Sequence, residues 1–410
     1  MTLRASAEAN ALRHPQFVLY LLAVGCASFA VQIMSVSVGW QIYDITRDPI
    51  YLGYVGLAQF LPPLGLVLVT GLVADRFNRR FIMVACLGVE ALCALGFLVF
   101  TLSHPTGVWP MFAILAVLGI ARAFLNPASD ALAPNLVPKE AIPHAISLSV
   151  MVWQTASIAG PVAGGLLYGI AGEVAYGVAL ALIAIAALLV LLIGSVAQPN
   201  HVAEETSLST LFAGFAFIRK DRIVLGAISL DLFAVLLGGA VALLPVYARD
   251  ILEVGPWGLG LLRAAPGVGA ILMALYLARY GIRDKAGVIL FAFVAAFGFF
   301  TIVFGLSTSV PLSIAALVIM GACDMVSVYI RETILQLWTP DEVRGRVNAV
   351  NRVFIGASNE LGEFRAGVMA AWIGTVAAVT FGGAGTMAVA GLWSRWFPEL
   401  RTTRRLDGRR

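Results

Sequence analysis

Ionisable side chains interrupt several long apolar segments of this chain, and they are its first candidates for chemistry. A charged group at the centre of a bilayer costs about 3 kcal/mol or more, so such a group is expected to be functional or paired. Asp231 has no cation three or four residues away, and a carboxyl in that position can take up and release a proton. Glu360 and Glu363 share a helical face, and they are the second candidate for a proton site, or equally for a site that holds a cationic substrate.

Arg122 and Asp324 occupy equivalent positions in two copies of an internal repeat. With an offset of 202 residues, Gly119 aligns with Gly321 and Arg122 with Asp324. Two interpretations remain open. Either the two charges face each other across the inner half of a central pathway, as an ion pair that breaks when the inner side opens, or each is neutralised locally within its own half of the chain.

Amide and aromatic side chains in the neighbouring segments suit a large amphiphilic ligand, although packing between helices is the ordinary role of any single one. These weaker candidates for a substrate cavity are Gln32, Trp40, Gln59, Trp153 and Gln154. Arg263 joins them, and it is also placed to answer one of the acidic groups at Glu360 and Glu363.

The composition decides which elements must position these groups. Of the 410 residues 60% are hydrophobic and 12% are charged, whereas an ordinary soluble domain is about 25% charged. This excludes a soluble enzyme, a disordered chain and a small disulfide-stapled fold. We expect an all-α integral membrane protein, with the lipid bilayer as its first partner.

The usual sequence patterns of catalytic, metal and nucleotide sites are missing. Four cysteines stand in apolar runs without a CxxC pair, and four histidines are scattered without HExxH spacing. No GxxxxGK(S/T) loop is found, so ATP does not drive the protein directly. The net charge of +4 comes from basic residues spread over the gaps between apolar runs, which argues against a nucleic-acid partner. We therefore expect no enzymatic activity, no metal and no cofactor.

Twelve segments are long and apolar enough to span a bilayer, which takes about 20 residues at 1.5 Å each. They cover residues 17–42, 51–74, 81–102, 109–132, 144–169, 174–196, 223–247, 256–278, 286–307, 311–335, 346–372 and 375–396. The first is too long for a cleavable signal peptide, so we expect it to remain as a helix.

The basic residues orient these spans. If the N-terminus is cytoplasmic, the inner segments hold nineteen Lys and Arg residues, and the outer loops hold Arg47 and Arg249 alone. Both termini are therefore expected in the cytoplasm.

One inner connection is longer than the others and divides the chain into two six-helix bundles, residues 1–196 and 223–397. Residues 197–222 are expected to link them through an amphipathic helix, because apolar residues recur there at helical spacing: Leu208, Leu211, Phe212, Phe215 and Ile218. Residues 398–410 are expected to form a basic cytoplasmic tail.

Two short motifs add a family resemblance. Gly71, Asp75, Arg76, Arg79 and Arg80 follow the second span, and their spacing resembles the GxxxD(R/K)xxRR motif of the major facilitator superfamily. In the fifth span the glycines and proline of a second motif resemble the GPxxGG pattern of proton-coupled exporters in that superfamily, with Ala156 where an earlier glycine is usual: Gly160, Pro161, Gly164 and Gly165. Residues 122–138 and 339–349 resemble the bacterial branch that contains the enterobactin exporter and macrolide efflux proteins.

The resemblance implies two pseudo-symmetric bundles that rock about a central site, in the bacterial inner membrane, as a monomer. It implies a latch on the inner face, in which Asp75 faces the start of span eleven and Arg79 pairs with Asp130. It also implies export of a siderophore or drug-like amphiphile in exchange for protons. An importer or lysolipid flippase on the same fold remains the alternative, and a non-transporting receptor is the third.

A charge exchange tests the interpretation that Arg122 and Asp324 form a pair. If the two residues pair, Arg122→Asp and Asp324→Arg each abolish transport and their combination restores it, because the exchange recreates the attraction with its sign reversed. Transport that stays absent in the double variant means that the two residues do not pair.

Overall fold

The computed structural model describes residues 10–104, 107–194, 215–282 and 284–404, apart from the side chains at 67, 68, 72, 74, 75, 341 and 342. This part of the chain is helical and contains no strand. The first helices are α2 (Pro15–Thr46), α3 (Ile50–Arg76), α4 (Arg79–Leu102), α5 (Trp109–Leu132), α6 (Ile142–Ile170) and α7 (Gly172–Leu192). The later ones are α9 (Arg222–Gly238), α10 (Leu244–Val246), α11 (Gly255–Tyr280), α12 (Ala286–Leu306), α13 (Val310–Trp338), α14 (Asp341–Ile373), α15 (Thr375–Trp396) and α16 (Pro398–Arg401).

The expected fold class is confirmed. Among the described residues, 10 helical segments are long and apolar enough to cross a membrane, and α3 adds a shorter apolar stretch, Ile50–Leu66. The most polar of the long helices is α14, which carries Glu360, Glu363 and Arg365 and corresponds to the expected span at 346–372. With α3 and α14, the described residues contain the twelve long helices that the sequence predicts.

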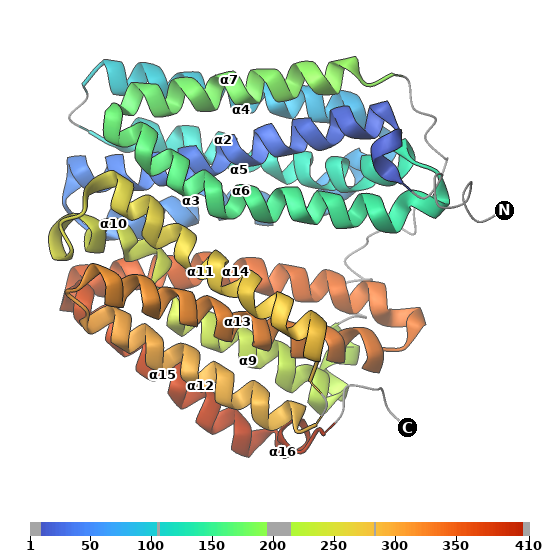
Figure 1. Cartoon of the computed structure of the whole chain (residues 1–410), viewed down its shortest axis with the longest axis vertical. Coiled ribbons are helices and arrows are strands. Elements are labelled where there is room, and N and C mark those ends of the chain that lie inside the picture. Colours follow the sequence, from blue (N-terminus) through green and yellow to red (C-terminus); the bar gives the residue numbers. More distant parts are fainter. Residues whose placement is uncertain (1–9, 105–106, 195–214, 283, 405–410) are drawn as a thin grey trace. The chain divides into compact units, whose positions relative to one another are not determined.

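The chain divides into two compact units. The first comprises residues 1–46 and 58–206; in it α2 packs against α6 and α7, and α4 packs against α5 and α7 (Figure 1). The second comprises residues 47–57 and 207–410, so it includes the first residues of α3. Within this second unit α12 packs against α13 and α15, α11 against α13, and α9 against α14 and α15.

The seventh expected span, 223–247, is not one continuous helix. Helix α9 ends at Gly238, and short helical turns follow at Val241–Leu243, Leu244–Val246 and Tyr247–Ile251. The break comes at Gly238 and Gly239, where a Cβ on Gly239 would lie 3.0 Å from the carbonyl carbon of Gly362 in α14. Two glycines let the chain turn and let α14 approach the backbone, and neither effect shows in an apolar pattern.

The described part of the expected linker is short. Leu208, Leu211 and Phe212 lie outside the described residues, whereas 215–220 are helical. Ile218 is buried in the core of the second unit, and the Phe215 ring lies 6.5 Å from that of Phe354.

The end of the chain packs against the start of α12. The backbone N–H groups of Ala286 and Gly287 donate to the carbonyl oxygens of Arg404 and Thr403, at 3.2 and 3.0 Å. Leu400 is completely buried. These bonds satisfy amides that a helix N-terminus otherwise leaves without partners.

Close helix packing at glycine gives a prediction for stability. A Cβ at Gly321 of α13 would overlap the carbonyl oxygen of Pro266 in α11, whereas a Cβ at Gly391 of α15 would meet nothing within 4 Å. Gly321→Ala should therefore lower the free energy of unfolding by about 1–3 kcal/mol through overpacking. Gly391→Ala is the matched control and should leave the thermal unfolding curve in detergent unchanged or shift it upward. Equal curves for the two variants would contradict the packing described here.

Candidate functional site

A buried ion pair joins α9 to α13 in the second unit. Arg331 Nη1 lies 2.6 Å from Asp231 Oδ2, and the two side chains are 7% and 10% exposed. Arg331 Nε also donates to Ser327 Oγ, at 3.1 Å. The sequence of α9 predicts an unpaired Asp231, because no cation lies three or four residues away. The structure corrects this prediction, since the cation comes from α13, a hundred positions further along the chain. The two opposite charges largely neutralise each other where neither is tolerated alone.

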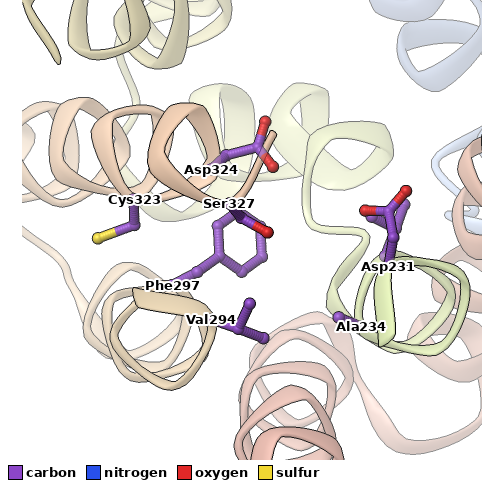
Figure 2. A pocket seen from close by; sticks show the side chains of 8 residues that line it. Asp231, Ala234, Val294, Phe297, Cys323, Asp324 and Ser327 are labelled. Atoms are coloured by element: carbon purple, nitrogen blue, oxygen red, sulfur yellow. The ribbon is translucent and has the colours of Figure 1, made fainter. Parts of the chain in front are cut away.

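A pocket with an empty volume of about 310 Å³ adjoins this ion pair. Figure 2 shows it from close by. Three helices line it: α9 with Asp231, Ala234 and Val235, α12 with Val294 and Phe297, and α13 with Cys323, Asp324 and Ser327. Most of the wall is apolar, and its polar groups come from two facing helices, as expected for a small-molecule site.

Asp324 is the pocket residue whose carboxyl group can still accept a ligand. Its side chain is exposed, and within the described residues no hydrogen bond or ion pair reaches it. Its charge interacts with those of Arg331 and Asp231. Two carboxyl groups therefore share one guanidinium, which already lies against Asp231. The arrangement leaves Asp324 able to bind a proton, a cation or a hydrogen-bond donor.

The second acidic group forms another charged cluster in the same unit. Arg263 of α11 interacts electrostatically with Glu363 and Glu360 of α14, as its position predicts. The two acids share a face: a Cβ on Gly56 would lie 2.8 Å from Glu360 Oε2 and 3.3 Å from Glu363 Oε2. This cluster brings one cation to two carboxyl groups, the same ratio as at Asp231 and Asp324.

Arg365, on the same helix, binds the broken end of α9. Its Nη2 donates to the carbonyl oxygen of Leu237, one residue before α9 ends, and its Nη1 lies 3.0 Å from Met369 Sδ. Carbonyl groups at a helix C-terminus lack intrahelical partners and carry partial negative charge, so a guanidinium is a favourable partner. Arg365 therefore stabilises the break rather than extending the acidic cluster.

In the first unit, the arginines of the loop motif bind helix C-termini. Arg79 Nη1 donates to the carbonyl oxygen of Ala131 at the end of α5, at 3.0 Å, beside Asp130. Arg80 Nη2 donates to the carbonyl oxygen of Leu191 at the end of α7. Arg76 is exposed, and the side chain of Asp75 lies outside the described part of the chain. The expected pairing of Arg79 with Asp130, and of Asp75 with the start of span eleven, stays a prediction.

The glycine motif of α6 packs on α2. Gly160, Pro161, Gly164 and Gly165 are all buried. A Cβ on Gly160 would lie 2.6 Å from Gln32 Cβ, and one on Gly164 would lie 2.9 Å from Ile33 Cα. The motif therefore lets these two helices approach closely, and it places Gln32 in a packing contact.

The other expected cavity residues are dispersed. Trp40 is buried, Gln59 and Gln154 are half-buried, and Trp153 is 56% exposed. The structure does not bring these four together in one pocket among the described cavities. Arg122 interacts with Glu90 of α4 in its own unit, and its pairing with Asp324 stays a prediction.

One buried hydrogen-bond network was not predicted from the sequence. Tyr176 Oη donates to Gln41 Oε1 at 2.8 Å, and Gln41 Nε2 donates to Thr101 Oγ1 at 3.0 Å. It ties α7, α2 and α4 together. The three residues share no spacing along the chain, although a glutamine inside an apolar span was a signal that it needed partners.

Charged groups inside two units of membrane-length helices are features of a multi-pass membrane transporter. The chain belongs to the major facilitator superfamily and, within it, to the transmembrane secretion effector family, whose model matches residues 6–407. Enterobactin exporter EntS of Shigella boydii serotype 18 is 27% identical over 404 residues, which cover 95% of this chain and 94% of that protein. Enterobactin exporter EntS of Escherichia coli O157:H7 matches with the same identity, over the same number of residues and with the same coverage of both chains.

Solved structures show the same fold at low identity. The POT family transporter PepTSo superposes with a TM-score of 0.73 at 12% identity, covering 95% of this chain and 99% of that one. A bacterial homologue of the human lysosomal transporter Spinster, inward-facing and occupied, gives 0.72 at 15% identity, again covering 95% and 99%.

The buried ion pair gives a stability prediction. Arg331→Gln leaves Asp231 buried without its cation, so we expect a loss of about 3–5 kcal/mol in the free energy of unfolding. Adding Asp231→Asn should recover most of that loss, because no uncompensated charge remains. The measurement is thermal or denaturant unfolding in detergent.

The control is Arg47→Gln at the exposed Arg47–Asp250 pair, whose atoms lie 3.5 Å apart. It should cost about 0–1 kcal/mol. If Arg331→Gln proves as mild as this control, the pair does not stabilise the unit.

Proposed function

We propose that the protein is a secondary active exporter that moves small amphiphilic organic molecules, siderophore-like or drug-like, out of the cell in exchange for protons. One observation carries the proposal: Asp324 faces a largely apolar pocket beside the buried Asp231–Arg331 pair. The apolar wall suits the body of an amphiphile, and the carboxyl group suits a proton or a polar part of the cargo.

Competition at Asp324 is the simplest source of coupling. The Asp231–Arg331 pair is nearly neutral, so Asp324 contributes the remaining negative charge of the pocket. A proton on Asp324 removes that charge, and a cargo group that binds the carboxylate needs it deprotonated. Proton and cargo then exclude each other, so each passage of cargo in one direction returns a proton in the other.

The proposed cycle is a rocker switch between two bundles about the central site. Arg79 and Arg80 hold the ends of α5 and α7 to the start of α4, which supports a first bundle that moves as one body. We place the inner latch at Asp75, Arg79 and Asp130. The tight contact of Gly160 and Gly164 with α2 supports a role for the second motif in shaping that bundle.

Export rather than import is supported by the relatives, which are named enterobactin exporters. The same likeness supports a place in the bacterial inner membrane. The excess of basic residues in the inner segments supports cytoplasmic termini. We propose that the protein works as a monomer without a nucleic-acid partner.

Inverted membrane vesicles with an acid interior and a pH-sensitive dye test the antiport. Siderophores, macrolides, dyes and lysolipids are added one at a time, and a cargo should collapse the gradient as protons leave. Asp324→Asn should reduce this response at least tenfold, because the amide cannot exchange a proton. Glu399→Gln is the control, since it removes a carboxyl that is 43% exposed and pairs with Arg222 outside the pocket.

A full response in Asp324→Asn would contradict the assignment of this residue and direct attention to Glu360 and Glu363. If no compound collapses the proton gradient with the wild type, while a known antiporter responds in parallel, the antiport is contradicted. Import or lipid movement would then be favoured.

A further inference from the structure

The first unit contains a buried carboxyl that the proposed cycle does not use. Glu90 lies midway along α4 and is 0% exposed. Neither of its carboxyl oxygens has a hydrogen-bond partner within the described residues. Cys86 and Cys93, four residues before and three after it, share its side of the helix and are buried as well. An unsatisfied group at this depth requires a physical reason.

Within the described residues, the cation that acts on Glu90 is Arg122. Helix α4 packs against α5 and α7. On α5 the ionisable residues are Arg122, whose charge interacts with Glu90, and Asp130, two turns nearer the inner end. On α7 they are Glu173 in the first turn and Tyr176, which donates to Gln41.

The cations of α4 itself are committed elsewhere, because Arg79 and Arg80 bind the ends of α5 and α7. An ionised carboxylate without a single hydrogen bond would be very costly in this setting. Glu90 is therefore neutral in this conformation, with Arg122 near but not bonded to it.

A cavity lies close to this position, although Glu90 itself does not line it. Its empty volume is about 380 Å³, and it lies among α2, α4 and α5. Leu87, three residues before Glu90, and Leu125, three residues after Arg122, both line it. Ser28, Asn126 and Ser129 add polar groups that can hold water. The cavity thus begins one helical turn from the carboxyl and one turn from its cation.

We propose that Glu90 is a second proton-binding residue of the transport cycle, located in the first unit. In this conformation its carboxyl is protonated. In the other conformation the O–H bond breaks, the proton passes to water in the cavity, and the carboxylate pairs with Arg122. The role in coupling rests on the proposed proton antiport, whereas the proton on Glu90 and its exchange with the cavity do not.

Infrared spectroscopy on the purified full-length protein in lipid vesicles tests the proton directly. The C=O stretch of a protonated carboxyl should be present at neutral pH, disappear in Glu90→Gln and persist in Asp324→Asn. In deuterium oxide the band should shift. Ala27 of α2 lines the cavity, so Ala27→Phe should fill it and slow that shift at least tenfold. The proposal is overturned if the C=O band is unchanged in Glu90→Gln, or if Ala27→Phe leaves the rate of deuterium exchange unchanged. Glu90→Asp serves if the glutamine variant does not fold.

Transport separates proton binding from a merely structural acid. Glutamine imitates the neutral acid in shape, so a structural role predicts wild-type coupling in Glu90→Gln. Proton binding predicts that cargo still binds while cargo-driven proton movement falls at least tenfold, with partial recovery in Glu90→Asp. Wild-type coupling in Glu90→Gln overturns the role in the cycle. If the wild type itself moves no protons, the antiport has failed, and the infrared result alone decides whether Glu90 binds a proton.

Discussion

The cost of an ionised group away from water is the constraint on which this structure depends. Asp231 and Arg331 meet it by neutralising each other across two helices, at 2.6 Å. That contact holds α9 against α13, and Arg331 fixes Ser327 as well. The wall of the pocket is therefore set by the ion pair. Asp324 can remain available to a ligand only because the neighbouring aspartate already has the guanidinium.

Arginine meets the same constraint at helix ends. Arg79, Arg80 and Arg365 each donate to a backbone carbonyl at or near a helix C-terminus, where partial negative charge accumulates. A guanidinium has five donors and a permanent charge, so it can bind a carbonyl and keep further contacts, whereas lysine offers a single point charge. Of the 27 basic residues only Lys139, Lys220 and Lys285 are lysine. That preference fits a protein whose cations bind helix ends.

Composition and apolar run length predicted the helical membrane fold, because membrane-spanning helices leave a signal in every residue of the span. The position of Arg263 near Glu360 and Glu363 also followed from sequence, since depth along neighbouring spans is countable. The partner of Asp231 could not be predicted from the sequence, because helical spacing rules cover residues three or four positions apart and Arg331 is on another helix. The break after Gly238 was hidden for a similar reason: the run stays apolar, and only the approach of α14 explains the turn.

The contact between the chain end and α12 also sets an order of assembly. Leu400 is buried, and the carbonyl groups of Thr403 and Arg404 receive the first amides of a helix that begins over a hundred residues earlier. During synthesis, α12 emerges long before these partners exist. The second unit therefore cannot complete its packing until translation has passed residue 404. Until then the first amides of α12 must bond to other partners, such as water.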